Sequence, residues 1–411
     1  MLAPVSRDSW AVITSQAISD AARRLAGVIR PTPAATSEEL SGLMGRRVII
    51  KPEHLQRTGS FKIRGAYNRL AALAPGEVSE VIAASAGNHA QGVALASALC
   101  GLHATIFMPT GASLPKIEAT RGHGATVELV GTSVDEAIEA ARAAAAASGA
   151  LYVPPFDDDL VIAGQATIGV ELAEEAPEAE VVVVPVGGGG LISGVAAGLA
   201  AAGHRARVIG VEAAGATAML AALKAGTPSK LATVDTIADG IAVRAVSART
   251  LEHVQALVTT IVTVDDEQIS AAMLVLLERC KWVVEPAGAV ALAAVMAGAV
   301  DGDGPVAVVC SGGNVDPLLL SRLITHGLLA AGRYFIVRVV VPDRPGSLAA
   351  LTAKLGELGL NLLTVEHQRF GTRAGINEVE VVVTLETRDP AHRDAIVPAL
   401  EDAGFRAEPY H

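Results

Sequence analysis

The run Thr58-Gly59-Ser60-Phe61-Lys62-Ile63-Arg64-Gly65-Ala66 places a lysine between an aromatic and a β-branched side chain, just after a Thr-Gly-Ser turn. Apolar neighbours reduce the solvation of an ammonium group, so we expect the pKa of Lys62 to be lowered and its amine to act as a nucleophile and a base. Such a lysine can hold an aldehyde cofactor as a Schiff base. Most lysines are solvated surface charges, and the prediction therefore depends on motifs elsewhere in the chain.

A glycine cluster, Gly187-Gly188-Gly189-Gly190, follows an apolar run and precedes Leu191 and a helix predicted over residues 192 to 202. Glycines allow a tight turn that brings several backbone N–H groups onto one anion, and the helix start adds the positive end of its dipole. A phosphate group suits this arrangement. The spacing matches neither GxGxxG nor GxxxxGK[ST], which argues against a dinucleotide or ATP loop. For this segment alone, a tight turn without a ligand is the alternative.

A second loop of small residues, Ser85-Ala86-Gly87-Asn88-His89, ends a predicted strand and opens a helix. Backbone N–H groups at a helix start form an anion site, which here suits a carboxylate. The amide of Asn88 could bond a phenolic oxygen on a cofactor ring. For His89 we weigh an acid–base role against a structural role in a buried helix, and the structural role is the commoner one.

Two further polar residues leave alternatives open. Ser311, in Cys310-Ser311-Gly312-Gly313-Asn314, could place a neutral hydroxyl against a ring nitrogen or could serve as a helix N-cap. Glu285 stands before a helix that Pro286 starts, either as a functional acid or as a charge that complements the helix dipole.

The four features together define one chemistry. A reactive lysine, a phosphate loop, a carboxylate loop and a hydroxyl for a pyridine nitrogen point to pyridoxal 5'-phosphate (PLP) acting on an amino acid. We expect these loops at the carboxyl ends of parallel strands, where open α/β sheets bind ligands.

Short β-branched runs alternate with alanine-rich helical stretches through the first 330 residues or so. Continuous runs of this kind are typical of strands buried on both faces, and hence of parallel sheets built from βαβ units. We therefore predict an α/β catalytic part with strands near residues 48–50, 81–83, 104–107, 126–130, 181–184, 208–211 and 306–309.

The remaining residues follow the order β-α-β-β-α-β, which is the ferredoxin-like plan. This tail is a candidate for oligomerisation or ligand sensing. Its predicted strands are residues 333–341, 361–370, 376–385 and 405–410, and its predicted helices are 345–358 and 390–403.

Composition excludes several classes of protein. The formal charge of −11 gives a nucleic-acid partner no electrostatic support. The longest apolar stretches are too short and too alanine-rich to span a bilayer, and the first ten residues lack the order of a signal peptide, so we expect a cytoplasmic protein. The three cysteines have neither a disulfide framework nor metal-ligand spacing, and we read them as small buried residues.

With these motifs assembled, residues 15 to 330 closely resemble the threonine/serine dehydratase family of fold-type II PLP enzymes. The motifs TGSFKIRGA, SAGNHAQG, GGGGL, EPAGA and CSGGN occur in the family's order. The resemblance implies a two-lobed, tryptophan synthase β-like catalytic domain with parallel sheets. It also implies that Lys62 carries PLP, that Phe61 packs beside the ring, and that Asn88 bonds the 3-hydroxyl. Ser311 would meet the pyridine nitrogen, and the phosphate would be bound by Gly187, Gly188, Gly189, Gly190 and Leu191. The substrate carboxylate would be received by Ser85, Ala86, Gly87, Asn88 and His89.

The tail resembles an ACT domain, which divides the chain into a catalytic domain over residues 1–330 and a regulatory domain over 334–411. One loop is similar to the segment by which ACT domains bind a free amino acid. A purely structural dimerisation domain is the alternative, and we expect a homodimer or homotetramer. The implied effector contacts are Asp343, Arg344, Pro345, Gly346 and Leu348.

The chain differs from related sequences in two places that bear on its chemistry. Related serine racemases carry a second serine where this chain has Ala86, so two-base racemisation is disfavoured here. Relatives that bind a divalent ion have an acidic group after Glu212, whereas Ala216 and Ala218 stand here, so we predict no divalent metal site. A monovalent cation held partly by backbone carbonyls stays open.

The resemblance implies dehydration and deamination of L-threonine to 2-oxobutanoate and ammonia, and of L-serine to pyruvate. It implies a place at the start of isoleucine biosynthesis, with allosteric control by an amino acid, isoleucine being the first expectation. The alternatives are a serine racemase, another fold-type II β-eliminase or β-replacement enzyme, a catabolic threonine/serine dehydratase, and an amino-acid sensor without catalysis.

Overall fold

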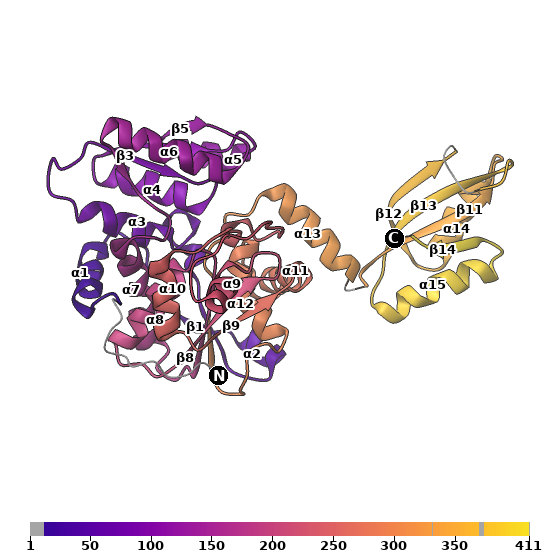
Figure 1. The fold of residues 1–411 in the computed structure, drawn as a ribbon. Helices are drawn as coiled ribbons and strands as arrows, with labels where there is room; N and C mark the ends of the chain where they lie inside the picture. Colours follow the sequence, from indigo (N-terminus) through magenta and orange to yellow (C-terminus); the bar gives the residue numbers. More distant parts are fainter. Residues whose placement is uncertain (1–11, 331, 370–373, 411) are drawn as a thin grey trace. The chain divides into compact units, whose positions relative to one another are not determined.

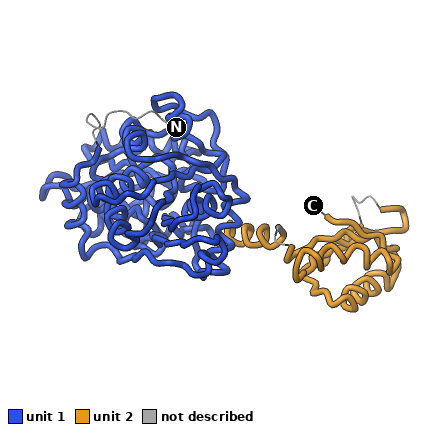
Figure 2. The backbone as a smooth tube through the Cα atoms, turned by 90° about the horizontal axis from the view of Figure 1, so that it is seen from below, with its two compact units in different colours: residues 1–316 blue, residues 317–411 orange. Residues whose placement is uncertain are grey.

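Runs of β-branched residues build the two sheets of the catalytic part of the chain (Figure 1). The structure, a computed structural model, describes residues 12–330, 332–369 and 374–410. The chain forms two compact units, Met1–Asp316 and Pro317–His411, which Figure 2 distinguishes by colour. By this division helix α13 (Pro317–Ala330), which we assigned to the first domain, falls in the second unit.

The larger sheet of the first unit has six strands in the order β1-β2-β10-β7-β8-β9. All neighbours are parallel except β1, which pairs antiparallel with β2. Strands β2, β10 and β7 are buried along their whole length, as their continuous apolar runs predict. The strands are β1 (Ala35–Thr36), β2 (Val48–Lys51), β7 (Val181–Pro185), β8 (Arg207–Ala213), β9 (Thr260–Val264) and β10 (Val306–Val309).

The smaller sheet is parallel and has the order β5-β4-β3-β6. Only its strand β3 (Glu80–Ala84) matches the expectation of burial on both faces. Strand β4 (His103–Met108) alternates between buried and partly exposed residues, and β5 (Thr126–Leu129) lies at the edge of the sheet and is mostly exposed. The expectation was wrong for these two strands because one face of β4 is only partly covered and β5 lies at the edge of the sheet.

All seven predicted strands of the catalytic part are present, and three others were missed. Strands β1 and β6 (Leu151–Tyr152) contain two residues each, too few to carry a pattern. Strand β9 lies at the edge of the larger sheet with only two of its five residues buried, and its threonines interrupt the continuous apolar run that we used as the signal.

Helices cover both sheets, and Figure 1 shows α4, α5 and α6 gathered around the smaller one. We call this sheet and its helices the small lobe, and the six-stranded sheet with its helices the large lobe. The helices of the unit are α1 (Ser15–Leu25), α2 (Glu38–Met44), α3 (Lys62–Ala71), α4 (Asn88–Leu99), α5 (Leu114–Gly122), α6 (Val134–Ser148), α7 (Asp159–Glu175), α8 (Gly190–Ala201), α9 (Ala218–Ala225), α10 (Ala248–Leu257), α11 (Asp266–Val275) and α12 (Pro286–Met296). Across the described residues, no helix is long and apolar enough to cross a membrane.

Close helix packing fixes α3, the helix that begins at Lys62. A Cβ atom at Gly164 of α7 would lie 2.5 Å from the carbonyl oxygen of Arg64 and 2.6 Å from Cα of Gly65. Only glycine permits two helices to approach so closely. The position of α3 is therefore set by backbone contact rather than by adaptable side chains.

A buried ionic cluster also holds this helix. The Arg64 guanidinium, fully buried, donates to the carboxylates of Glu53 and Glu171, with Nη2 of Arg64 2.7 Å from Oε1 of Glu53. Burial lowers the pKa of Arg64, but the two carboxylates outweigh it and raise the value. Lys51 at the end of β2 also contacts Glu171, at 2.7 Å. Removing one member would leave an uncompensated buried charge, which is strongly destabilising.

The second unit has the predicted ferredoxin-like plan. Its antiparallel sheet has the order β12-β13-β11-β14, and valines and leucines of the sheet pack against α14 and α15. Phe370, which we placed at the end of a strand, lies outside the described residues. The elements are β11 (Tyr334–Pro342), α14 (Ser347–Glu357), β12 (Asn361–Gln368), β13 (Glu378–Glu386), α15 (Pro390–Asp402) and β14 (Arg406–Pro409).

Candidate active site

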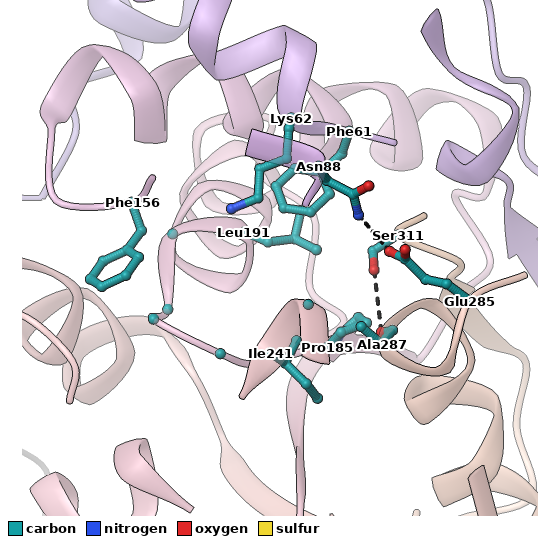
Figure 3. A pocket seen from close by; sticks show the side chains of 15 residues that line it. Phe61, Lys62, Asn88, Phe156, Pro185, Leu191, Ile241, Glu285, Ala287 and Ser311 are labelled. Atoms are coloured by element: carbon teal, nitrogen blue, oxygen red, sulfur yellow. Dashed lines mark hydrogen bonds between the residues drawn. The ribbon is translucent and has the colours of Figure 1, made fainter. Parts of the chain in front are cut away.

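The pocket of the first unit lies where loops from both lobes meet (Figure 3). Strands β2, β10 and β7 are neighbours, so the loops after their carboxyl ends come together, and the loop after β3 joins them from the smaller sheet. The pocket has a volume of about 450 Å³, including its open mouth. Its lining residues are Phe61, Lys62, Asn88, Phe156, Pro185, Gly187, Gly188, Gly189, Gly190, Leu191, Gly240, Ile241, Glu285, Ala287 and Ser311.

Lys62 begins helix α3 and points its amine into this pocket (Figure 3). Its Nζ lies 3.2 Å from the carbonyl oxygen of Pro155 and 5.1 Å from the centre of the Phe61 ring. Desolvation lowers the pKa of Lys62 to about 8, although the nearby carboxylate of Glu285 acts in the opposite direction. A larger fraction of this amine than of a solvated lysine is therefore neutral and nucleophilic near neutral pH.

The glycine loop presents a row of backbone donors. Gly189 has a φ of +92° and is the residue before helix α8. Within the described part of the chain, no acceptor is bonded to the amide groups of Gly187, Gly188 or Gly189. Buried N–H groups without partners are rare, and here they stand at the positive end of a helix of twelve residues. The loop is thus built to receive an anion.

Phe156 forms a wall against this loop (Figure 3). A Cβ atom at Gly188 would lie 2.1 Å from Cδ1 of the Phe156 ring, and one at Gly190 would lie 2.7 Å from Cβ of Phe156. The glycines are therefore required by the contact with Phe156 as well as by the turn. Phe156 was missed from the sequence, because it lies in an irregular segment between β6 and α7 without a recognisable pattern.

Asn88 stands at the start of α4 and makes two side-chain hydrogen bonds. Its Nδ2 donates to Oε1 of Glu285 at 2.5 Å, and its Oδ1 accepts from Nδ2 of Asn314 at 2.7 Å. The structure thus joins Asn88 from the small lobe to two loops of the large lobe.

Ser311 follows β10 and is 4% exposed. Its hydroxyl donates to the carbonyl oxygen of Ala287 at 3.3 Å, which leaves its oxygen lone pairs available to the pocket. No helix begins at Ser311, since α13 starts at Pro317 in the described chain, so the alternative of a helix N-cap was wrong.

The loop predicted for a carboxylate is only partly in the pocket. Asn88 lines the pocket, whereas Ser85, Ala86, Gly87 and His89 are not among its lining residues. The His89 ring is buried, and its Nε2 lies 2.9 Å from the carbonyl oxygen of Val153. Burial lowers the pKa of His89 to about 3, so the ring is neutral at physiological pH. This geometry favours the structural role for His89.

The EPAGA segment does not follow a strand, contrary to our expectation for the motif loops. It follows a short π-helical turn, Leu276–Cys280, and an irregular segment that ends at Glu285. Glu285 nevertheless reaches the pocket, because helix α12 begins beneath Ser311 and packs against the larger sheet.

Comparison with known proteins places this geometry in a family. A model described as "Pyridoxal-phosphate dependent enzyme" matches residues 25–312, and an ACT domain model matches residues 335–405. L-threonine ammonia-lyase of Thermotoga maritima is 46% identical over 396 residues, which cover 96% of this chain and 98% of that relative. The chain belongs to the threonine ammonia-lyase family.

Two solved structures with a similar fold carry the names of two different enzymes, a threonine deaminase and a serine racemase. The processed form of threonine deaminase isoform 2 from Solanum lycopersicum is 37% identical with a TM-score of 0.73, and the match covers 80% of this chain and 94% of that one. Maize serine racemase is 33% identical with a TM-score of 0.72, covering 78% and 98%. The predicted family, fold class and ACT tail are confirmed, and the protein is a PLP-dependent ammonia-lyase.

The pocket of this ammonia-lyase fits PLP. Every residue predicted from the sequence to contact the cofactor lines this one pocket. The unpaired amides of the glycine loop suit the phosphate, and the Lys62 amine suits the aldehyde. Lys62 would hold the cofactor covalently, and the glycine loop would hold it through its anion.

Glu212 has a structural contact in this enzyme. Its carboxylate oxygens accept from the backbone N–H groups of Met219 at 2.7 Å and Leu220 at 3.0 Å, at the start of α9. Burial raises the pKa of Glu212 to about 7. Among the described residues, no group of three His, Cys, Asp or Glu side chains stands close enough to hold a metal ion.

The predicted effector loop of the ammonia-lyase lies between β11 and α14. Its Asp343 carboxylate accepts from the Arg369 guanidinium at 3.0 Å, and its backbone N–H bonds the carbonyl oxygen of Asn377 at 2.8 Å. Gly346, with a φ of +94°, precedes α14. Asp343, Arg344, Pro345 and Gly346 are exposed, and Leu348 is half-buried against the core of the unit.

Proposed function

We propose that this enzyme converts L-threonine to 2-oxobutanoate and ammonia, and L-serine to pyruvate by the same route. The supporting observation is the Lys62 amine, with its pKa lowered to about 8, in one pocket with an anion-binding glycine loop. The 46% identical relative is named an L-threonine ammonia-lyase, which favours threonine as the principal substrate.

Lys62 has two proposed tasks. It anchors the cofactor covalently, and once the substrate amine has replaced it, the freed amine takes the proton from the substrate Cα. PLP, when bound, supplies the conjugated system that stabilises the resulting negative charge. The lowered pKa of about 8 keeps part of the amine population neutral, as a base requires.

The other pocket residues have proposed roles in binding. Gly187, Gly188, Gly189, Gly190 and Leu191 hold the cofactor phosphate, Phe61 packs beside the ring, and Asn88 donates to its phenolic oxygen. Ser311 offers the ring nitrogen a neutral hydroxyl, which turns from the carbonyl oxygen of Ala287 to donate its O–H and does not hold that nitrogen protonated. The loop from Ser85 to His89 receives the substrate carboxylate through backbone N–H groups.

Elimination is favoured over racemisation by one side chain. Ala86 offers no proton on the face of the substrate opposite Lys62, where a racemase needs a second base. The fold alone does not separate these reactions, since maize serine racemase shares it.

A product assay tests the proposed reaction. Purified enzyme with PLP is incubated with L-threonine, L-serine and their D-isomers, and oxo acid, ammonia and inverted amino acid are measured. We expect 2-oxobutanoate and ammonia in equal amounts from L-threonine, with no accumulation of the D-isomer. Inverted amino acid as the main product would replace the proposal by a racemase.

We further propose that the second unit senses an amino acid, with isoleucine as the expected ligand and isoleucine biosynthesis as the setting. The supporting observations are the ACT match over residues 335–405 and the exposed loop of Asp343 to Gly346. The test is threonine turnover with and without isoleucine or valine, for the full chain and for a chain that ends at residue 333. An identical response of both chains to every amino acid would leave the unit with a structural role.

A further inference from the structure

Glu285 is a buried carboxyl group in the pocket whose role the proposed function leaves open. It occupies the position before helix α12, yet its side chain makes no capping hydrogen bond to that helix. Its Oε1 instead accepts from Nδ2 of Asn88 at 2.5 Å, across the boundary between the two lobes. Glu285 is 4% exposed, so this contact is made almost without solvent. The helix-dipole interpretation therefore does not account for where the side chain points (Figure 3).

Gly312 makes room for this carboxylate. A Cβ atom at Gly312 would lie 2.1 Å from Oε1 of Glu285. The space that Gly312 leaves open also admits Asn88, whose Nδ2 would be 2.9 Å from that Cβ atom. The chain thus keeps side chains out of the volume in which the two groups meet.

The contact decides which way the Asn88 amide faces. A carboxylate has only acceptors, so the amide must turn an N–H toward Glu285. Asn314 donates its Nδ2 to Oδ1 of Asn88 at 2.7 Å, and the same Nδ2 lies 2.7 Å from the carbonyl oxygen of Thr58. Both neighbours therefore require the same amide orientation, and the second N–H of Asn88 is left for the pocket.

We propose that Glu285 is a positioning residue that fixes the Asn88 amide so that an N–H, and not the carbonyl, meets the phenolic oxygen of PLP. This inference rests on the cofactor contact that the proposed function assigns to Asn88. It also gives Glu285 a charge-dependent task, because only the ionised carboxylate is a pure acceptor. A protonated carboxyl is a weaker, uncharged acceptor and can also donate, so this contact then orients the amide less strongly.

The surroundings of Glu285 place this change of charge near neutral pH. Burial and the carboxylate of Asp239 raise its pKa to about 7, while the Asn88 bond, Lys116 and Lys62 act in the opposite direction. Asp239 lies in the large lobe beside Gly240, Lys116 comes from α5 of the small lobe, and Lys62 begins α3. Because the pKa is raised, the orienting carboxylate is present above about pH 7 and is lost as the pH falls through that value.

A double-mutant cycle on PLP affinity tests the proposal. Apoenzyme forms of wild type, Glu285→Ala, Asn88→Ala and the double variant are titrated with PLP at about pH 8, and binding is followed by the absorption of the bound cofactor. A charge-assisted hydrogen bond lost at Asn88 should weaken PLP affinity roughly tenfold or more. If Glu285 acts through Asn88, Glu285→Ala should change the Asn88→Ala enzyme by no more than about twofold. Independent, multiplied losses would overturn the proposal.

The isosteric variant Glu285→Gln allows a second measurement, the pH dependence of PLP affinity. A merely structural role of Glu285 would not affect this dependence. Its side-chain oxygen can still accept from Asn88 but does not titrate. Because Gln is uncharged, as protonated Glu285 is, we expect its PLP affinity at pH 8 to be about threefold or more below wild type, with no further loss attributable to position 285 between about pH 8 and pH 6. The wild-type enzyme should show an additional loss over that range, beyond the change due to Lys62. A Glu285→Gln enzyme with the wild-type pH profile would contradict the proposal.

Neither measurement uses threonine. Failure of the cycle would remove the role of Glu285 and leave the proposed reaction standing, whereas failure of the product assay would leave the cycle intact. Thermal midpoints of the apoenzymes show whether each variant is folded, and Glu285→Gln keeps the test available if Glu285→Ala does not fold.

Discussion

Two helices of this enzyme begin after a glycine in the left-handed region, one in each unit. Gly189, with a φ of +92°, precedes α8, and Gly346, with a φ of +94°, precedes α14. Neither residue supplies a side-chain cap, so both helices present backbone N–H groups at their starts. The local backbone is therefore nearly the same in the two places.

The surroundings of the two glycines differ completely. A Cβ atom at Gly189 would lie 2.6 Å from Cε of Met219 and 2.8 Å from Cβ of Thr250, whereas one at Gly346 would meet no described atom within 4 Å. The start of α8 is enclosed by the pocket that contains Lys62, and the start of α14 is exposed. A glycine before a helix thus predicts the turn, while the residues packed around it decide whether the turn is a formed binding site.

The largest expected effect comes from removing the reactive group beside the enclosed helix start. Lys62→Ala removes both the covalent anchor and the base, so threonine turnover should fall by more than about 10⁴-fold. Borohydride reduction followed by peptide mass analysis should find PLP attached at position 62 in the wild type and nowhere in the variant.

Lys224→Ala, at an exposed lysine of α9, is the matched control and should stay within about twofold of wild type. Near-normal turnover in Lys62→Ala, or a cofactor adduct on another lysine, would remove the basis of the comparison between the two helix starts.

The same substitution at both glycines tests the comparison directly. Each alanine pays the left-handed penalty of about 1–2 kcal/mol. Gly189→Ala adds an overlap with Met219 and Thr250, so we expect a further loss of about 1–3 kcal/mol and PLP binding weakened at least about tenfold. Gly346→Ala should leave PLP affinity unchanged.

Thermal midpoints and PLP titrations of the two variants measure this difference. Equal effects on PLP binding would mean that enclosure of the α8 start has no importance for the cofactor.

The sequence predicted the fold and the cofactor residues well because both depend on local patterns. Buried strands such as β7 and β10 are continuous apolar runs, and the motif loops follow them along the chain. Every residue predicted to contact the cofactor reached a single pocket. The carboxyl ends of the adjacent parallel strands β2, β10 and β7 meet at one edge of the larger sheet, and the loop after β3 joins them from the smaller sheet.

What the sequence did not predict depends on contacts between segments far apart in the chain. Phe156 lies against the glycine loop only because the segment before α7 returns to it, and no periodicity marks that residue. Glu285 was recognised, but its contact with Asn88, 197 positions away, is set by how the lobes meet. The two-face burial of β4 failed because segments elsewhere in the chain decide how far each face is covered, and the Ser311 N-cap failed because the next helix begins only at Pro317.

A smaller effect is expected at the exposed helix start. Asp343→Asn weakens the contact with Arg369 and changes the charge of the proposed effector loop. Couplings between sites are typically 5- to 150-fold, so the response to the effector should fall by roughly fivefold or more while basal turnover changes less than about twofold. The pair is exposed, and stability should change by less than about 1 kcal/mol. Threonine turnover over a series of isoleucine concentrations measures the response, and an unaltered response would exclude Asp343 as an effector contact.

The smallest effect is expected at the ion pair between Lys116 of the small lobe and Asp239 of the large lobe. This pair tests how charges around the enclosed site act on Glu285. Asp239 raises the pKa of Glu285 and Lys116 lowers it, so the two partners should have opposite effects. Asp239→Asn should move the acid limb of PLP binding to lower pH, and Lys116→Met should move it to higher pH. Because Asp239 is largely exposed, we expect shifts below about one pH unit. PLP titrations at a series of pH values give the two midpoints. Opposite shifts require an electrostatic effect on Glu285. Shifts in the same direction would mean that the pair acts by holding the lobes together, because loss of either partner breaks that contact equally.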